Sequence, residues 1–383
     1  MLFINYLIKI KINMIQRFFS SKRNPSIEFY RIIGSLIVIG VHSKDSVLNK
    51  INYKGTKNFI SCIFADGVSI FWFILGFYLF KSKDYYILIK KFLKRIYVKY
   101  FALGIVFIIS EKYFSKKPIY PTFKYIKNIF HKLLIFKNPF PYLGASWYLY
   151  TYFLILFLYP VLKQFINYLD EDFSRKRNFI IIALLLLVIN DYMYNQTFMF
   201  SHRSINSVFP STIQVILGYV LKNSFTFKRK KYYILLSAAI FYILNIIRTL
   251  LLNTFPCKNI IFWYSSFGAI NALIIFIFSV SVIPYDKCEK CYHYFINYVA
   301  SNTFGVYLIH IYVKSILLNS NFGKNLISLK YSKNNNITFM VLSLAFLISI
   351  IFIISMTIVI IYSFILNLFI KLIKNIRNII IKK

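Results

Sequence analysis

The sequence predicts an all-α polytopic membrane protein with about ten transmembrane helices. Hydrophobic residues make up 58% of the 383 residues, and charged residues make up only 15%. The mean hydropathy is +0.62. A water-soluble chain of this length needs far more polar surface, whereas long apolar runs separated by short basic segments are typical of membrane helices.

Ten apolar spans follow one another along the chain, and the last is longer than one crossing needs. We therefore expect that span to tilt or to continue along the cytoplasmic surface. Residues 1–26 read as a basic cytoplasmic leader, 27–370 as a single transmembrane domain and 371–383 as a basic cytoplasmic tail. The predicted spans run over about 27–47, 60–80, 93–111, 145–162, 178–194, 206–222, 232–252, 261–283, 294–318 and 338–370.

The distribution of Lys and Arg predicts the orientation. The formal net charge is +36, but these residues lie in short loops between apolar spans, which argues against a nucleic-acid partner and favours contact with anionic membrane lipids. With the N-terminus inside, the inner segments hold 28 of the 47 Lys and Arg residues and the outer loops hold 16. Both termini are therefore predicted to be cytoplasmic.

The predicted outer loop 111–144 contains the segment PTFKYIKNIFHKLLIF. Its apolar residues recur at helical spacing with Lys124, Lys127, His131 and Lys132 opposite them. This pattern predicts an amphipathic helix on the outer leaflet, and a lid over an acceptor site is the alternative.

The four cysteines do not indicate a metal site. Cys288 and Cys291 form one isolated CEKC with His293 nearby. A zinc site needs a second pair of ligands, and haem attachment needs His directly after the second Cys. We expect no metal.

The first span, EFYRIIGSLIVIGVH, carries three ionisable residues, Glu28, Arg31 and His42. Ionisable groups inside a membrane are expensive and by default suggest function. Arg31 and His42 are eleven residues apart, which places them on nearly the same helix face and about 16 Å apart along the axis.

Asp66 in the second span and His310 in the ninth are predicted to lie at the depth of His42. A non-catalytic interpretation exists for each residue. His42 lies near a helix end and can simply reach the membrane interface, and Asp66 lies near a helix start and can simply cap it. Arg248, near the outer end of the seventh span, is a further candidate for contact with an anionic acceptor.

The segment KKFLKRIYVK places Lys91, Arg95 and Lys99 at i, i+4 spacing near the cytoplasmic side. The general excess of Lys and Arg in the cytoplasmic loops of membrane proteins explains such a segment. A phosphate-binding cluster that includes Arg31 also explains it, because Arg and Lys bind phosphate oxygens through charge-assisted hydrogen bonds.

Several motifs resemble the acyltransferase-3 family, in order over nearly the whole chain. They are IEFYRIIGSLIVIGVH, GVSIFWFILGF, SWYLYTYFLILFLYPVL, VILGYVLK and SNTFGVYLIH. Leu75 stands where the family has Ser, and Phe92 replaces one Arg of its paired-Arg motif, with Lys91 beside it. The resemblance implies a bacterial plasma-membrane enzyme that transfers an acyl group, commonly acetyl from acetyl-CoA, to a hydroxyl of a glycan or lipid-linked sugar.

The residues then suggest roles in that reaction. His42 is the expected general base, because a neutral imidazole can accept a proton at physiological pH. Asp66 is expected to orient His42, and His310 or Tyr307 to donate a hydrogen bond to the thioester oxygen. Arg31, with the cluster Lys91, Arg95 and Lys99, is expected to hold the donor phosphates.

Two other classes of membrane protein fit the same composition. A polysaccharide transporter or flippase also has ten or more spans with midplane charges, and a polysaccharide polymerase carries a large charged outer loop. Neither needs a donor-phosphate cluster joined to a base along one helix.

Overall fold

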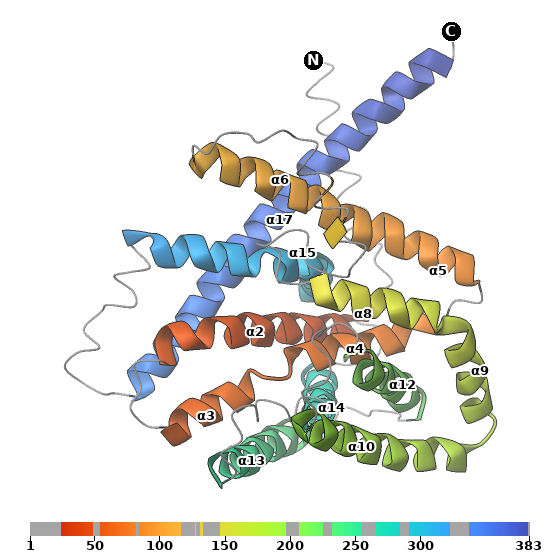
Figure 1. Cartoon of the computed structure of the whole chain (residues 1–383), viewed down its shortest axis with the longest axis vertical. Coiled ribbons are helices and arrows are strands. Elements are labelled where there is room, and N and C mark those ends of the chain that lie inside the picture. Colours follow the sequence, from red (N-terminus) through yellow and green to blue (C-terminus); the bar gives the residue numbers. More distant parts are fainter. Residues whose placement is uncertain are drawn as a thin grey trace.

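The computed structural model describes residues 24–48, 54–81, 84–115, 127, 131–132, 146–196, 207–224, 232–254, 266–283, 291–321 and 337–381. This part of the chain is helical, with no strands within it (Figure 1). The elements are α2 (Pro25–Leu48), α3 (Lys54–Ile63), α4 (Gly67–Leu79), α5 (Tyr85–Phe92), the π-helix η1 (Leu93–Tyr97), α6 (Val98–Ser115), α8 (Ser146–Phe157), α9 (Tyr159–Asp170), α10 (Phe173–Gln196), α12 (Val208–Ser224), α13 (Tyr232–Thr254), α14 (Ser266–Val282), α15 (Cys291–Asn319) and α17 (Ile337–Ile381).

Helix α2 begins at a well-formed N-terminus. The side chain of Asn24 accepts hydrogen bonds from the backbone N–H groups of Ser26 (2.9 Å) and Ile27 (3.4 Å). Pro25 takes the first helical position, where its missing N–H costs nothing. The hydroxyl of Ser26 donates to the carbonyl of Ile283 (2.7 Å), which ties this end of α2 to the end of α14.

Helix α2 also lies at the centre of the molecule. It packs against α4, α14, α15 and α17, and Figure 1 shows it running between these helices. Because α2 carries both Arg31 and His42, the helices around it set the surroundings of both residues.

Helices α4 and α12 cross at very close range. A side chain at Gly76 would collide with the backbone of Val215, and one at Gly218 would meet the carbonyl oxygen of Phe73 at 2.5 Å. Glycine at both positions lets the two backbones approach, as small residues commonly do between membrane helices.

Two predicted spans are broken. The predicted span 60–80 is divided into α3 and α4, with a turn over residues 64–66. The predicted span 145–162 is divided into α8 and α9, which meet at 65°. Pro160 lies at the start of α9, and because proline has no N–H to donate, α8 does not continue through it.

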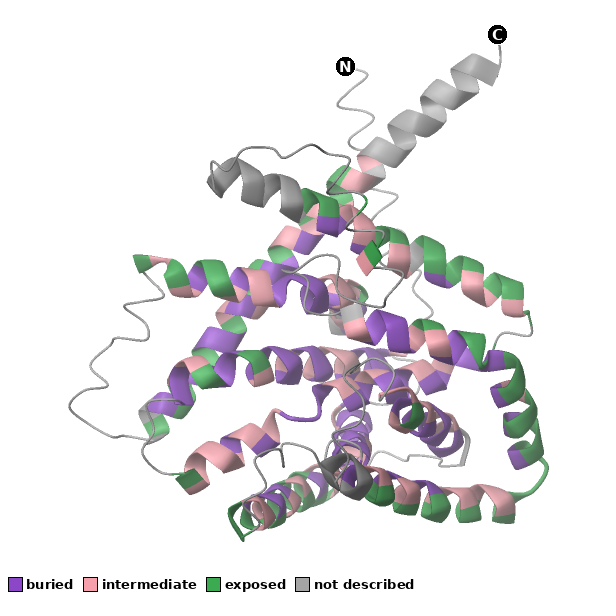
Figure 2. Cartoon of the chain, in the orientation of Figure 1, coloured by how far each residue is buried: buried purple, intermediate pink, exposed green. Residues whose placement is uncertain are grey.

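Each of the ten predicted spans overlaps at least one helix, but fewer helices qualify as spans by length and composition. Four described helical stretches are long and apolar enough, one of them being α3 and α4 taken together (Lys54–Leu79), or five if α8 and α9 count as one bent span. The chain is therefore a multi-pass membrane protein, whereas the total of ten and the orientation stay predictions. Apolar side chains are exposed on α10 and α13, in keeping with contact with lipid (Figure 2).

The last predicted span extends further than expected. Helix α17 has 45 residues, which corresponds to a length of about 68 Å, roughly twice the hydrocarbon core of a bilayer. The predicted tail from residue 371 is therefore helical as far as residue 381. The predicted outer amphipathic segment lies outside the described residues except for Lys127, His131 and Lys132.

Candidate functional site

The structure brings together the two histidines that were predicted to lie at one depth. The rings of His42 in α2 and His310 in α15 have centroids 5.1 Å apart at an interplanar angle of 45°. His310 is buried, with 2% of its surface exposed. His42 is exposed on the side of α2 that faces α15. A buried imidazole thus lies against an accessible one.

The hydrogen bonding of His310 determines its neutral form. Its Nδ1 lies 2.8 Å from the carbonyl oxygen of Tyr307. A carbonyl oxygen only accepts, so Nδ1 carries the proton and Nε2 keeps its lone pair. Among the described residues Nε2 has no hydrogen-bond partner, although it is buried. Neutral His310 can therefore accept a hydrogen bond at Nε2 but cannot donate one there, which disagrees with its predicted role as a donor to the thioester oxygen.

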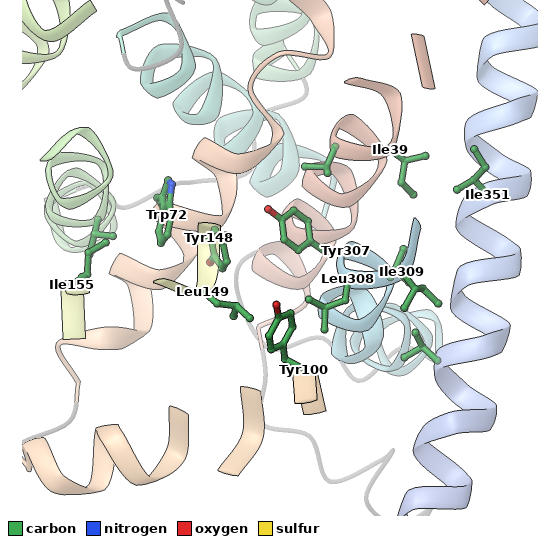
Figure 3. Packing of buried hydrophobic residues seen from close by; sticks show 14 of the residues in the cluster. Ile39, Trp72, Tyr100, Tyr148, Leu149, Ile155, Tyr307, Leu308, Ile309 and Ile351 are labelled. Atoms are coloured by element: carbon green, nitrogen blue, oxygen red, sulfur yellow. The ribbon is translucent and has the colours of Figure 1, made fainter. Parts of the chain in front are cut away.

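A row of aromatic rings leads from the histidine pair toward Arg31. Tyr307 lies one turn before His310, with ring centroids 6.0 Å apart, and its ring is 5.6 Å from that of Tyr148 in α8. Tyr148 is in turn 6.4 Å from Tyr152. Figure 3 shows Tyr307 and Tyr148 facing one another, with Trp72 beside Tyr148.

Arg31 lies at the other end of this row. Its charge acts on both Tyr148 and Tyr152, so Arg31 lies in the neighbourhood of these two rings of α8. Its Nη1 donates to Glu28 Oε2 at 3.0 Å, and the side chain of Glu28 is almost fully buried while that of Arg31 remains 21% exposed. Arg31 therefore has a fixed position and still has donors for another ligand.

The predicted phosphate-binding segment packs against Tyr152 through Phe92. Phe92 is buried and packs on Tyr152 with ring centroids 4.9 Å apart. Lys91 and Lys99 are exposed, and Arg95 lies in the π-helix η1, with its side chain outside the described part. Arg31 and this segment thus both lie near Tyr152, and π-helical segments frequently occur at functional sites.

Asp66 has a partner that the sequence analysis did not predict. Arg248 Nη1 donates to both of its carboxylate oxygens, at 2.8 and 3.1 Å, and Asn271 Nδ2 donates to Oδ2 at 2.7 Å. Each of the three residues has at most 2% of its surface exposed. Asp66 does occupy the N-cap position of α4, but its side chain makes no capping hydrogen bond because Arg248 and Asn271 engage it.

The carboxylate of Asp66 is therefore committed to Arg248 and Asn271, and the predicted pairing with His42 is not among its contacts. The sequence indicated that Arg248 needs a polar partner but not which residue that partner is. Arg248 is an arginine inside an apolar span, and such a residue almost always pairs with another polar group within the bundle.

The described residues contain no group of three or more His, Cys, Asp or Glu side chains that could hold a metal ion. His42, His310 and Tyr307 supply a proton acceptor, a second lone pair and a hydroxyl within one short stretch of the bundle.

Comparison with known proteins identifies the family. The family model of the acyltransferase domain called acyltransferase-3 matches residues 24–370, nearly the whole chain. No curated protein matches the chain. No solved structure matches it either. The histidine pair, the row of rings and the family match agree, and this multi-pass membrane protein is an acyltransferase that belongs to the acyltransferase-3 family.

Proposed function

We propose that this protein is an O-acyltransferase of the bacterial plasma membrane. It moves a short acyl group, most simply acetyl, from cytoplasmic acyl-CoA to a hydroxyl of a cell-surface glycan or lipid-linked saccharide. The observation that carries the proposal is the His42–His310 pair, joined to Arg31 by a row of aromatic rings.

The length of α2 suits a donor that is charged at one end and reactive at the other. CoA has phosphate groups at its nucleotide end and a thioester at the tip of a long flexible arm. Arg31, with Lys91, Arg95 and Lys99 across Tyr152, would bind the phosphates, and the arm would follow the rings of Tyr148 and Tyr307. The thioester then reaches His42, about 16 Å further along α2.

Transfer needs a base for the attacking hydroxyl. In this mechanism the hydroxyl oxygen attacks the thioester carbonyl carbon while its proton passes to the lone-pair nitrogen of His42. The tetrahedral intermediate then breaks its C–S bond. The thiolate of CoA leaves and takes the proton from His42, which yields the ester and free CoA.

His310 and Tyr307 would assist at the same point. The Nε2 lone pair of His310 can accept a hydrogen bond from the ring of His42 when His42 is protonated, which stabilises that form. The hydroxyl of Tyr307 can donate to the thioester oxygen as negative charge develops there. These roles differ, so they can be separated by substitution.

Purified protein in detergent, incubated with radiolabelled acetyl-CoA and a glycan acceptor, tests the proposal. We expect His42→Ala to reduce transfer by about 10²–10⁴-fold, the usual contribution of a general base. His131→Ala, which removes an exposed histidine, is the matched control and should retain transfer. Full transfer by His42→Ala at normal expression would contradict the assignment.

The same assay separates the proposal from a transporter or a polymerase. A transporter would release no CoA from acetyl-CoA, and cells that lack it would fail to export the unmodified glycan. A polymerase would change the glycan chain length instead of its acylation.

A further inference from the structure

A cation lies directly beside the histidine pair. Lys314 is one turn beyond His310 on α15, and its ammonium group donates to the backbone carbonyl of His42. Its charge also acts on His310. Whatever group binds next to His42 therefore meets a positive charge on the α15 side.

Lys314 has no counter-ion among the described residues. Asp45 acts on it through space, but the two do not form an ion pair. The contact with the His42 carbonyl uses one of three ammonium hydrogens, so two donors remain. The side chain is only half-buried, so those donors are within reach of a ligand.

A second lysine, Lys44, lies two residues after His42 and therefore about 200° around α2 from it. Lys44 has only 7% of its surface exposed and makes no ion pair within the part of the chain that the structure describes. The charge of Asp45 attracts it through space, while the charges of Lys57 and Arg248 repel it. Asp66 does not balance the charge of Lys44, because its carboxylate is already paired with Arg248.

The excess of positive charge needs an explanation. A buried charge without a partner is costly, and removal of one partner from a buried pair typically destabilises a protein strongly. Membrane topology does not supply the reason, because we predict this end of α2 to face outward, where lysine is not favoured. The segment 44–57 nevertheless contains four lysines and one acid.

We propose that Lys314 binds an anionic group of the acceptor, a carboxylate or a phosphate, next to the hydroxyl that is acylated. This inference rests on the proposed function for the identity of that hydroxyl. Charge-assisted hydrogen bonds from Lys314 would fix the acceptor one helical turn from the His42–His310 pair. The acceptor class is therefore an acidic saccharide.

Two matched probes test the inference, 4-nitrophenyl β-D-glucuronide and 4-nitrophenyl β-D-glucoside. They differ only in a carboxylate in place of a hydroxymethyl group. Binding to the purified protein is measured by calorimetry without acetyl-CoA, and acylation is measured by mass spectrometry with it. We expect the glucuronide to be favoured by about 10- to 100-fold, the value of a hydrogen bond to a charged group.

Variants separate recognition from structure. Lys314→Gln should bring the ratio of glucuronide to glucoside close to one, and Lys314→Arg should restore most of it, whereas a purely structural role would lower both rates together. Lys54→Gln removes an exposed lysine at the start of α3 and should keep the wild-type ratio.

Each outcome bears on one proposal. A binding preference for the glucuronide that Lys314→Gln removes supports the anion site even if neither probe is acylated, and in that case the proposed transfer fails. No binding preference, or a preference that Lys314→Gln leaves intact, overturns the anion site even if acyl transfer occurs.

Discussion

At the scale of single residues, the tautomer of His310 determines which of its ring nitrogens can accept a hydrogen bond. The carbonyl of Tyr307 fixes the proton on Nδ1, so the buried Nε2 is available only as an acceptor. Of the two groups predicted to stabilise the thioester oxygen, only the hydroxyl of Tyr307 can then donate. The helix that carries both residues thus presents an acceptor and a donor one turn apart.

Substitution of His310 tests this assignment. Glutamine can place its amide oxygen near the position of Nε2 and so keep an acceptor, whereas phenylalanine keeps the ring and removes the lone pair. We expect His310→Phe to lower kcat by about 10²-fold and His310→Gln to lower it less. Steady-state kinetics with labelled acetyl-CoA measures the difference, and equal loss in both variants, with unchanged thermal unfolding, would contradict it.

The rise per residue predicted that His42 and His310 lie at one depth, and the structure places their ring centroids 5.1 Å apart. The shared helix face of Arg31 and His42, which rests on helical periodicity, stays a prediction. Sequence reasoning could not predict that Asp66 pairs with Arg248, which is 182 residues away. Depth along a helix can be estimated from the rise per residue, but which helices are neighbours depends on packing. Helical periodicity therefore could not decide whether His42 or Arg248 is the partner of Asp66.

At the scale of elements, the Asp66–Arg248–Asn271 triad joins α4, α13 and α14. It lies where the predicted span 60–80 is broken, and Asp66 is the residue that starts α4. The hydrophobic pattern predicted this span without its break, because residues 60–65 are mostly apolar and contain no Pro or Gly. At this break Asp66, the last residue of the turn, is held by Arg248 and Asn271.

We expect the triad to contribute to stability rather than to the chemical step. Asp66→Asn or Arg248→Met each leaves the other charge buried without a partner, which typically costs about 3–5 kcal/mol. The double variant should cost less than the two single changes together, because it leaves no unpaired charge. Thermal unfolding of the purified variants in detergent measures this coupling. Additive losses would show that the ion pair is unimportant, and a loss of kcat without a loss of stability would favour the catalytic role predicted for Asp66.

At the scale of the whole molecule, the proposed reaction requires α2 to cross the membrane. The proposed donor is a cytoplasmic compound and the proposed acceptor is a saccharide of the cell surface, so Arg31 and His42 would face opposite sides. The Lys and Arg distribution predicts that Arg31 lies toward the cytoplasm.

The orientation can be tested in whole cells by cysteine labelling. The background is a variant whose four native cysteines are replaced by serine. In it, Asn321→Cys places an exposed thiol just beyond α15, at the end that carries His310. Ser174→Cys places an exposed thiol near the start of α10. Because 28 of the 47 Lys and Arg residues fall in the segments predicted to be inside, we expect a membrane-impermeant maleimide to label Asn321→Cys in intact cells. Ser174→Cys should react only after the cells are made permeable, which also serves as the control for thiol reactivity. The reverse pattern would place the histidine pair on the cytoplasmic side, and an acceptor at the cell surface would then be out of reach of His42.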